Sequence, residues 1–456
     1  MTRSGRARLP RLVVLTRYPQ PGATKTRLAP VLGDDGAAAL HSELARRCVR
    51  RMHATALSGA VDLEVQVSGA SARRTQRWLG RRVAVRQQVG GDLGDRLAAP
   101  STRAIADGAP AVVLVGSDAP ELSGARVREA LAALSDADVV LGPALDGGYY
   151  LAALASGSAA RAVPALFGPH IAWGTESVLD QSLAAARASG LTVQLLSPLG
   201  DIDRPDDLEL WESVIAGEER ARLDPRLSVV IPALDEEPGI ASAIESAWHA
   251  GAGEVIVADG GSADRTTSLA RESGARVVTA ERGRARQLNA GAAGANGDIL
   301  LFLHADTTLP PDALALIRDA MADPEVTLGA FRFAAGDPTR TADRLISFVG
   351  ALRHRVFRLP YGDQAPFIRK RDFFDLGGFP DIPVMEDYEL ARRCARLGDL
   401  SLAPAPARTS ARAWQDHGLL RTTAMNAAVI AGYRLGVPMD TLATWRQRVS
   451  DRSPSR

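Results

Sequence analysis

The sequence has little of what marks membrane, secreted or nucleic-acid-binding proteins. Its 456 residues include only two cysteines, and the formal net charge is +1. That near-neutral balance gives no argument for a nucleic acid or an anionic membrane as a partner. No apolar run approaches the roughly 18 residues that span a bilayer, and no signal-type apolar segment follows the basic first residues. We expect a soluble cytoplasmic protein without an integral membrane segment and without a nucleic-acid partner.

Cysteine and histidine are also too scattered to indicate a disulfide or a zinc site. Cys48 and Cys394 lie in different halves of the chain, where buried reduced thiols are the simpler interpretation. His170, His354 and His417 show no HxH or HExxH spacing, so we expect surface or core histidines rather than metal ligands.

What the chain does contain is one alternating pattern, used twice. Apolar content of 46% and charged content of 23% are typical of a globular protein. Short apolar segments alternate with amphipathic ones in each half, and residues 216–227 between the halves are charged and contain a proline. The pattern predicts an α/β protein with two tandem doubly wound domains, residues 1–222 and 226–456, joined by a linker.

The stretch GDILLFLHADTTLP, residues 297–310, is expected to form the centre of the second domain. Its apolar run 299–304 is typical of a strand buried on both faces, and Asp306 follows directly. Open α/β sheets bind ligands at the carboxyl ends of their strands. A carboxylate beside the hydroxyls of Thr307 and Thr308 suits a hard divalent cation that carries a diphosphate. The alternative is that Asp306 only caps a helix beginning near Pro310.

Two other groups in this half have the right chemistry for a nucleotide. Asp259, Gly260 and Ser262 follow an apolar strand segment, where a carboxylate in a tight turn can accept hydrogen bonds from a ribose or a base. Arg284 and Arg286 come next along the chain. They are interpreted either as phosphate contacts or as a solvated basic face.

An acidic pair opens a later amphipathic helix. Glu386 and Asp387 stand in its first turn, where acids are often no more than caps. The functional alternative is that one of them deprotonates an acceptor hydroxyl.

The first half offers a second set of candidates. Lys25 and Arg27 follow a proline- and glycine-containing loop after the first strand, which is either a phosphate-binding arrangement or a solvated basic loop. Asp118 and Asp203 each end a predicted strand and could converge on one cation. A tight backbone approach to a ligand is permitted by a further group, Asp146, Gly147 and Gly148.

Five motifs of the second half resemble, in order and spacing, a family-2 inverting glycosyltransferase of the GT-A fold: VVIPALDEE, ADGGSADRT, HADTTLP, YGDQAPFI and GGFPDIPVMEDYEL. They are most similar to the branch associated with arsenosugar biosynthesis and radical-SAM/selenodomain proteins. The resemblance implies that Asp259 holds the nucleotide, Asp306 the metal and diphosphate, and that Asp387 is the general base, supported by Glu386. It implies further donor contacts from Pro232, Asp235, Glu236, Gly260, Ser262, Arg284, Arg286 and Arg412.

The sequence departs from that family at three positions. Asp235 stands where Asn is usual, and His304 takes the first position of the usual DxD, so Asp306 carries more of the metal binding. In SARAW, Ala413 replaces a second arginine, although Arg412 remains.

The first half resembles a different family, the partner transferase of the same biosynthetic group, through VVLTRYPQPGATKTRLAP, GDLGDRLA, VLVGSDAPEL, LGPALDGGYYL, WGT and DIDRPDDL. That family has a nucleotidyltransferase-like GT-A fold, distantly similar to molybdenum-cofactor and phospholactate guanylyltransferases. The resemblance implies phosphate contacts from Lys25 and Arg27, a metal on Asp118 and Asp203, and a sugar or base beside Asp146, Gly147 and Gly148.

We therefore expect a bifunctional, Mg²⁺- or Mn²⁺-dependent glycosyltransferase. The second domain would transfer a sugar from a nucleotide-diphosphate donor to a small acceptor with inversion, and the first would be a second glycosyl- or nucleotidyltransferase. Two alternatives remain open. The acceptor could be a lipid or carotenoid, with apolar segments 345–356 and 424–437 in peripheral contact with a membrane, and the first domain could be a non-catalytic binding module.

Overall fold

The computed structural model describes residues 8–80, 83–336, 339–341, 343–344, 346–347, 359–360, 362–410 and 419–450. The chain divides into two compact units. One consists of Met1–Glu218 with Asp375–Gly377, and the other of Glu219–Phe374 with Gly378–Arg456.

The first unit is built on a seven-stranded sheet in the order β3-β2-β1-β4-β6-β5-β7. The strands are β1 Arg11–Arg17, β2 Asp62–Ser68, β3 Ala84–Gln87, β4 Ala111–Gly116, β5 Val139–Pro143, β6 Tyr149–Ala155 and β7 Val193–Leu195. The helices are α1 Ala29–Leu57, α2 Ala72–Leu79, α3 Leu93–Ala106, α4 Gly124–Ala133, α5 Ala159–Phe167, α6 Val178–Ala188, η1 Pro205–Asp207 and α7 Leu208–Leu223.

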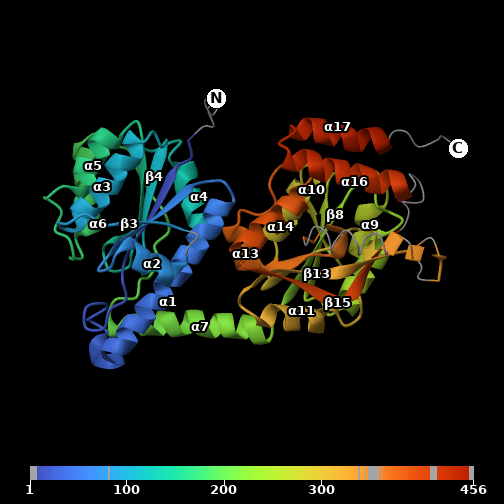
Figure 1. The fold of residues 1–456 in the computed structure, drawn as a ribbon, viewed down its shortest axis with the longest axis horizontal. Coiled ribbons are helices and arrows are strands. Elements are labelled where there is room, and N and C mark those ends of the chain that lie inside the picture. The colour runs from blue at the N-terminus through green and yellow to red at the C-terminus, as the bar shows by residue number, and fades with distance from the viewer. Residues whose placement is uncertain are drawn as a thin grey trace. The chain divides into compact units, whose positions relative to one another are not determined.

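Helices cover both faces of this sheet (Figure 1). Side chains alternate along a strand, and Val113 and Val115 of β4 pack into a core with α1 and α4. Val112 and Leu114 of the same strand pack into a second core with α3, α5 and α6. The doubly wound arrangement predicted from the continuous apolar run is therefore present.

The sheet is mixed rather than wholly parallel. Strand β1 pairs in parallel with β2 and β4, and β5 pairs in parallel with β7. Strand β6 runs antiparallel between β4 and β5. The carboxyl ends of β1, β4, β5 and β7 consequently meet at one edge, which is where ligands of such sheets bind.

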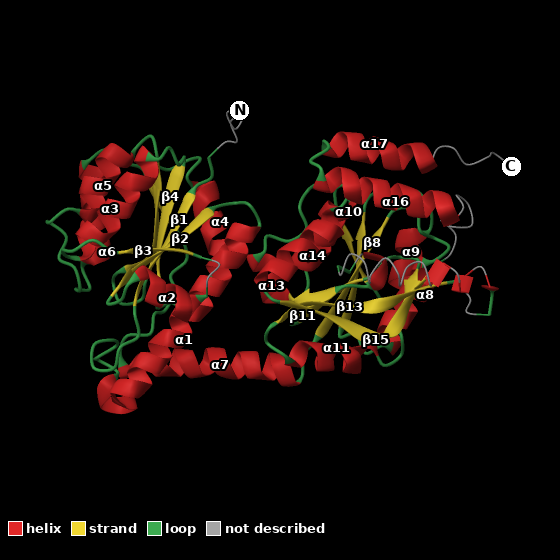
Figure 2. Ribbon diagram, viewed as in Figure 1, coloured by secondary structure: helices red, strands yellow, loops and turns green. Residues whose placement is uncertain are grey.

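The second unit has an eight-stranded sheet in the order β10-β9-β8-β11-β14-β13-β15-β12. Figure 2 shows strands of this sheet in yellow and helices in red. Its strands are β8 Leu227–Ala233, β9 Glu254–Asp259, β10 Arg276–Thr279, β11 Ile299–Phe302, β12 Thr307–Thr308, β13 Val326–Ala335, β14 Phe367–Arg369 and β15 Asp399–Thr409. Its helices are α8 Ile240–His249, α9 Thr266–Glu272, α10 Arg284–Ala293, α11 Ala313–Ala322, η2 Gly362–Gln364, α13 Lys370–Asp375, α14 Glu386–Leu397, α16 Leu419–Arg434 and α17 Met439–Ser450.

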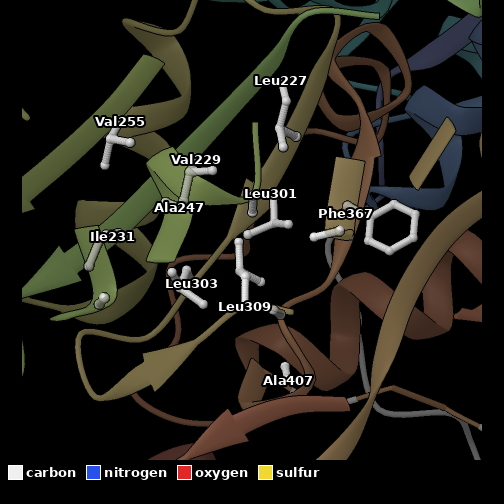
Figure 3. Close-up of a cluster of buried hydrophobic side chains, with 14 of the residues drawn as sticks. Leu227, Val229, Ile231, Ala247, Val255, Leu301, Leu303, Leu309, Phe367 and Ala407 are labelled. Carbon is white, nitrogen blue, oxygen red and sulfur yellow. The ribbon is translucent and has the colours of Figure 1, made fainter. Parts of the chain in front are cut away.

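Strands β10, β9, β8 and β11 are parallel and form one half of this sheet in the predicted α/β pattern. Leu227, Val229 and Ile231 of β8 point into a core that also contains Ala247 of α8 and Leu301 of β11 (Figure 3). On the opposite face, α10 packs so closely that a Cβ on Gly291 would lie 2.4 Å from Cγ1 of Val230. Strand β14 then joins β11 in antiparallel orientation.

One local prediction was wrong. The expected linker 216–227 is mostly helix, because α7 continues to Leu223 through residues with high helix propensity and ends before Pro225. Thr307 and Thr308 form the short strand β12 against β15. The compact units divide at Glu218, inside α7, and the domain limits 1–222 and 226–456 stay a prediction.

Other expectations agree with the fold. Cys48 and Cys394 are free and buried. Within the part of the chain that the structure describes, no helix combines the length and the apolar character needed to cross a bilayer. His170 bonds the carbonyl oxygen of Ala165 at 3.0 Å, as a structural histidine would. The predictions for His354 and His417 lie outside the described residues.

Candidate active sites

The candidate site of the second unit lies at the carboxyl edge of three neighbouring strands. Asp259 ends β9, Asp235 follows β8, and His304 and Asp306 follow β11. Because these strands are adjacent and parallel, the topology alone brings the three loops to one edge. A Cβ on Gly239, at the start of α8, would lie 2.7 Å from the carbonyl oxygen of Ala305, so the β8 loop packs directly against the β11 loop.

Asp259 is 6% exposed and organises its own turn. Its carboxylate accepts hydrogen bonds from the backbone N–H of Gly261 at 3.0 Å and from the hydroxyl of Ser262 at 2.5 Å. Gly261 has a φ of +95°, a conformation that favours glycine. Asp259, which we expect to contact the nucleotide, therefore also fixes the shape of its own loop.

The β8 loop is tied to this turn by reciprocal hydrogen bonds. The backbone N–H of Asp235 donates to Oγ of Ser262 at 2.9 Å, and Oδ1 of Asp235 accepts from the backbone N–H of Ala263 at 2.7 Å. Asp235 has a φ of +54°, and Asp and Asn are the residues that best tolerate this region. The change from the family's usual Asn to Asp therefore preserves the backbone conformation.

Asp387 is anchored by backbone groups. Its Oδ2 accepts from the N–H of Gly362 at 2.8 Å, and its Oδ1 accepts from the N–H of Tyr388 at 2.7 Å. A Cβ on Gly362 would lie 2.9 Å from Nε2 of His304, so His304 approaches the same glycine. The residue before this acidic pair, Met385, has a φ of +70°.

Glu386 has different surroundings from Asp387. It is 1% exposed and forms an ion pair with Arg284, the first residue of α10. Burial alone would lower the pKa of Arg284, but Glu386, Asp387 and Asp363 raise it above its ordinary value. The guanidinium therefore stays charged between α10 and α14 and sits beside both acids of the pair.

His304 and Asp306 belong to the same cluster. Burial and Arg284 lower the pKa of His304, and Asp306, Asp363 and Asp387 only partly oppose them, so the imidazole is neutral at pH 7. Asp306 lines a cavity of about 330 Å³ with Pro238, Gly239, Ser242, Ala243, Thr308 and Ser410. It does not cap a helix, since α11 begins only at Ala313 behind Asp312. The interpretation of Asp306 as a mere cap was wrong.

The donor set at this edge suits a divalent cation only in part. Within the described residues no group of three or more His, Cys, Asp or Glu side chains has the geometry of a metal site. Asp306 offers a carboxylate and His304 a neutral imidazole, and both are ligands that divalent metals accept. Such an ion would need further oxygen ligands from a phosphate, as Mg²⁺ sites of nucleotide enzymes do.

In the first unit, Lys25 brings two predicted acids together. Its Nζ lies 3.0 Å from Oδ1 of Asp118 and 3.6 Å from Oδ1 of Asp203. Arg27 pairs with the other oxygen of Asp203. The Lys25 side chain is only 5% exposed, and its φ of +52° is unusual for a residue with a side chain. The buried ammonium and its left-handed backbone are typical of a functional position.

His41 completes this arrangement from α1. The ring is 3% exposed, its Nδ1 lies 3.5 Å from Asp118, and its Nε2 lies 2.8 Å from the carbonyl oxygen of Arg17. Burial raises the pKa of Asp118, but Lys25 and His41 outweigh it, so the pKa lies well below its ordinary value. Asp118 is therefore ionised at all working pH values.

A cavity of about 310 Å³ opens beside these residues. Its lining includes the charged residues Arg27, Asp118, Asp146, Asp201, Asp203 and Arg204 and the apolar or aromatic residues Leu93, Leu97, Tyr149, Trp173 and Val178. The rings of Tyr149 and Trp173 meet edge to face, with centroids 6.3 Å apart. A volume near 300 Å³ with an apolar wall and convergent polar groups is typical of a small-molecule site.

Glycine is required at one point of this cavity. Gly147 has a φ of +88°, and a Cβ there would lie 2.1 Å from the carbonyl oxygen of Glu176. Its neighbour Asp146 accepts from the N–H of Gly148 at 2.9 Å. Burial and the nearby Asp146 raise the pKa of Asp201 to about 6. The close approach at Gly147 is to the backbone of Glu176, and the approach to a ligand expected at Asp146, Gly147 and Gly148 stays a prediction.

Several residues of the two sites were given no role from the sequence, and one expected donor contact pairs with other side chains instead. Gly362 and Asp363 lie in the motif YGDQAPFI and Asp201 lies in the motif DIDRPDDL, but none of the three was given a role. His41 was not singled out and lies in no such motif. Among the expected donor contacts, Arg286 pairs on the surface with Glu281 and Asp381. Arg412 lies outside the described residues. The roles of Pro232 and Glu236 stay predictions.

Two parts of the chain match known families. Residues 51–175 match the family described as an uncharacterized protein conserved in bacteria (DUF2064). Residues 228–378 match glycosyl transferase family 2. The second match lies almost entirely within the second unit. The match to that domain includes Asp259 and Asp306 and ends before Asp387.

Curated relatives are similar over a shorter range. Glucosyl-3-phosphoglycerate synthase of Mycolicibacterium paratuberculosis is 38% identical over 108 residues, which are 21% of this chain and 33% of that protein. The Mycobacterium tuberculosis protein of the same name is 38% identical over 104 residues, 20% of this chain and 32% of its own length. The chain thus spans about a third of the length of the curated relatives that it matches.

The solved structures to which this chain is similar cover about half of its length. A proposed nucleotide-diphospho-sugar transferase from Desulfovibrio desulfuricans G20 is 31% identical, with 47% of this chain and 90% of that chain covered and a TM-score of 0.40. Glucosyl-3-phosphoglycerate synthase from Mycobacterium tuberculosis, solved with Mn²⁺, UDP and glucosyl-3-phosphoglycerate, is 24% identical, with 49% and 85% covered and a TM-score of 0.35.

Proposed function

We propose that the family-2 domain transfers a sugar from a nucleoside-diphosphate donor to a hydroxyl of a small acceptor, with inversion. The observation that carries the proposal is the position of Asp387. Its carboxylate is held by two backbone N–H groups, next to His304 and in the charge field of Arg284. A fixed carboxylate at the ligand-binding edge of the sheet is what a general base requires.

In this proposal Asp387 accepts the proton of the acceptor hydroxyl as the sugar–oxygen bond forms. The oxygen that linked the sugar to the diphosphate leaves with the bonding electron pair. Glu386 is kept from that role by its ion pair with Arg284, and the pair fixes the first turn of α14. Pre-positioning of this kind supplies much of the rate enhancement in transfer reactions.

The donor would bind along the three loops of the sheet edge. Asp259 would accept hydrogen bonds from the nucleoside, and Asp306 would hold Mg²⁺ or Mn²⁺. Such an ion would offset the charge that develops on the leaving diphosphate. Further donor contacts are proposed for Pro232, Asp235, Glu236, Gly260, Ser262, Arg284, Arg286 and Arg412.

We propose a small polar acceptor, as in the name of the curated relatives, glucosyl-3-phosphoglycerate synthase. A specific role in arsenosugar biosynthesis is carried only by the motif resemblance and stays a prediction. The alternative lipid acceptor has less support. Val429 and Ile430, in the segment expected to contact a membrane, are buried inside the second unit.

For the first unit we propose a second nucleotide-dependent transferase site. The convergence of Lys25, Asp118 and Asp203 beside a cavity supports it. The carboxylates of Asp118 and Asp203 both lie beside the ammonium group of Lys25. Because carboxylate oxygens are the ligands that hard divalent cations prefer, the same two side chains suit such an ion. Asp118 and Asp203 would hold that ion, Lys25 and Arg27 would contact phosphates, and Asp146, Gly147 and Gly148 would line the sugar or base.

Substitution of Asp387 by Asn tests the glycosyl-transfer proposal. The amide keeps the shape of the side chain but cannot take a proton, so we expect turnover to fall by at least a factor of about 100, the contribution typical of a general base. UDP release from UDP-glucose with Mn²⁺ and 3-phosphoglycerate measures turnover, and calorimetry with UDP measures donor binding. UDP affinity should stay within about twofold of the wild type. Wild-type turnover in this variant would remove Asp387 from the mechanism.

A further inference from the structure

The two C-terminal helices pack on the turn that carries Asp387. A cluster of buried apolar residues joins Val384, Met385 and Tyr388 at the start of α14 to residues of α16 and α17, namely Val429, Ile430 and Leu442. A Cβ on Gly432 of α16 would lie 2.7 Å from Leu442, which shows how closely the two helices approach each other. We call α16 and α17 together the C-terminal hairpin.

Polar contacts join the hairpin to the two residues that follow Asp387. The hydroxyl of Tyr433 donates to Oε2 of Glu389 at 2.6 Å, and Nε of Arg434 donates to the hydroxyl of Tyr388 at 2.8 Å. Tyr388 is 2% exposed and Glu389 is 8% exposed, so both bonds reach buried groups. Hydrogen bonds to buried and charged groups are the ones whose loss costs most.

The backbone just before Glu386 and Asp387 is strained. Met385 has a φ of +70° without being glycine, which costs about 1–2 kcal/mol for an ordinary residue. Such a conformation persists only where the surroundings over-determine it. Met385 is 8% exposed and belongs to the cluster that the hairpin covers. The backbone N–H of Glu389 then bonds the Met385 carbonyl at 2.9 Å and closes the first turn.

The Tyr433 bond also holds across the working pH range. Burial and the adjacent Glu389 carboxylate raise the pKa of Tyr433 to about 12, so the phenol remains a donor. Burial raises the pKa of Glu389, but Arg392 and Tyr433 outweigh it and the pKa lies below its ordinary value. A neutral phenol therefore faces an ionised carboxylate throughout neutral pH.

We propose that Tyr433 and Arg434 are positioning residues for Asp387, which hold the strained first turn of α14 so that its carboxylate faces the acceptor. The inference rests on the proposed function of Asp387. Residues 419–450 lie beyond the part of the chain that matches the glycosyltransferase family, so that match does not assign a role to the hairpin. Neither residue is proposed to touch the donor.

The test compares Tyr433→Phe and Arg434→Lys with Thr444→Val in the full-length protein. Thr444 lies on the same hairpin, and its hydroxyl donates to the carbonyl oxygen of Asp440 in its own helix, at 2.8 Å. Hydrogen exchange of the amides of Tyr388 and Glu389 is the first measurement and needs no substrate. We expect both test variants to exchange at least about fivefold faster than the wild type, and Thr444→Val to exchange at the wild-type rate.

The second measurement is UDP release from UDP-glucose with Mn²⁺ and 3-phosphoglycerate. A displaced base lowers kcat, so we expect a tenfold to hundredfold fall in kcat with a KM for UDP-glucose within about twofold of the wild type. General loss of stability would instead lower the amount of active protein and leave the pH profile of kcat unchanged. We expect the acid limb of that profile to move in both test variants.

The outcomes separate this inference from the function on which it rests. If Asp387→Asn is inactive while Tyr433→Phe and Arg434→Lys keep wild-type exchange and kcat, the hairpin has no positioning role. If Asp387→Asn remains active, the proposed base is wrong, whereas faster exchange in the two test variants would still show that the hairpin holds the turn. Combining Tyr433→Phe with Asp387→Asn should lower kcat no further than Asp387→Asn alone, because both changes act on one group.

Discussion

Two acids stand side by side at the start of α14, and only their surroundings separate their roles. Glu386 is buried against Arg284, whereas Asp387 is held by backbone N–H groups at the sheet edge. The sequence marked both residues, but an acidic pair in a first helical turn looks the same whether it caps, pairs or catalyses. The distinction depends on Arg284 and Gly362, which come from distant parts of the chain.

Replacement of Arg284 by Met should destabilise the second unit by about 3 kcal/mol, because it leaves the Glu386 carboxylate buried without its counter-ion. Arg286→Met, two residues along the same helix, is the matched control. Its partners Glu281 and Asp381 are 80% and 62% exposed, so its loss should cost less than about 1 kcal/mol. Urea denaturation measures both changes. Equal effects would contradict the idea of a buried, structural ion pair at Arg284.

At the scale of elements, the candidate site of the second unit depends on contacts at the N-terminal ends of strands β9, β8 and β11 as well as on the residues at their carboxyl ends. Glu254 opens β9 and accepts from the hydroxyl of Ser228 at 2.6 Å and from the N–H of Asn296 at 2.5 Å. These bonds join the entrances of three neighbouring strands and thereby align the opposite ends, where Asp259 and Asp306 lie. Burial raises the pKa of Glu254, but the hydrogen bonds from Ser228 and Asn296 outweigh it and lower the pKa.

Glu254→Gln should therefore lower the stability of the second unit by about 1 kcal/mol at pH 7, the cost of disturbing hydrogen bonds to a half-buried carboxylate. Since the folded-state pKa lies below the ordinary value of 4.5, the stabilising effect is complete above that value. It is lost as the pH falls through the folded-state pKa, so the difference between wild type and variant should shrink in acid. Glu272→Gln, an exposed residue of α9, is the control. Denaturation from pH 3 to 7 decides, and a pH-independent difference would contradict the assignment.

The whole molecule carries two candidate sites, each built entirely within one compact unit. Lys25, Asp118 and Asp203 belong to the first unit, whereas Asp306 and Asp387 belong to the second. The two sets share no residue, so each proposed metal site should fill on its own. The two transfer steps that we propose would therefore not require the sites to communicate.

Asp306→Asn and Asp118→Asn should each bind one Mn²⁺ ion fewer than the wild type, and the double variant should bind neither ion. The reason is that each change removes a carboxylate ligand from a different unit. Equilibrium dialysis with Mn²⁺ and saturating UDP counts the ions, and Asp206→Asn, on an exposed side chain of η1, serves as the control. An unchanged count in Asp118→Asn would show that the first unit does not hold its metal on that residue.

Some features were out of reach of sequence reasoning for definite physical reasons. The end of α7, residues 216–223, was predicted as part of a linker because charged residues are common both in linkers and in exposed helices, and no buried stripe distinguishes this helix. Strand β12 has only two residues and exists because β15 supplies its partner. His41 lies in the middle of a long helix, and nothing in its neighbours along the chain predicts a contact with Asp118.

The sequence by itself determined the α/β class, the two tandem sheets and the acids at their strand ends. Hydrophobic periodicity and the polar residues that end a strand depend only on residues that are neighbours along the chain, so the sequence alone reveals them. Only the tertiary structure decided which of those acids are paired, buried or free to react. Ion pairs such as Lys25–Asp118 and Arg284–Glu386 join segments about 100 residues apart. The protonation and the orientation of a carboxylate follow from those distant neighbours.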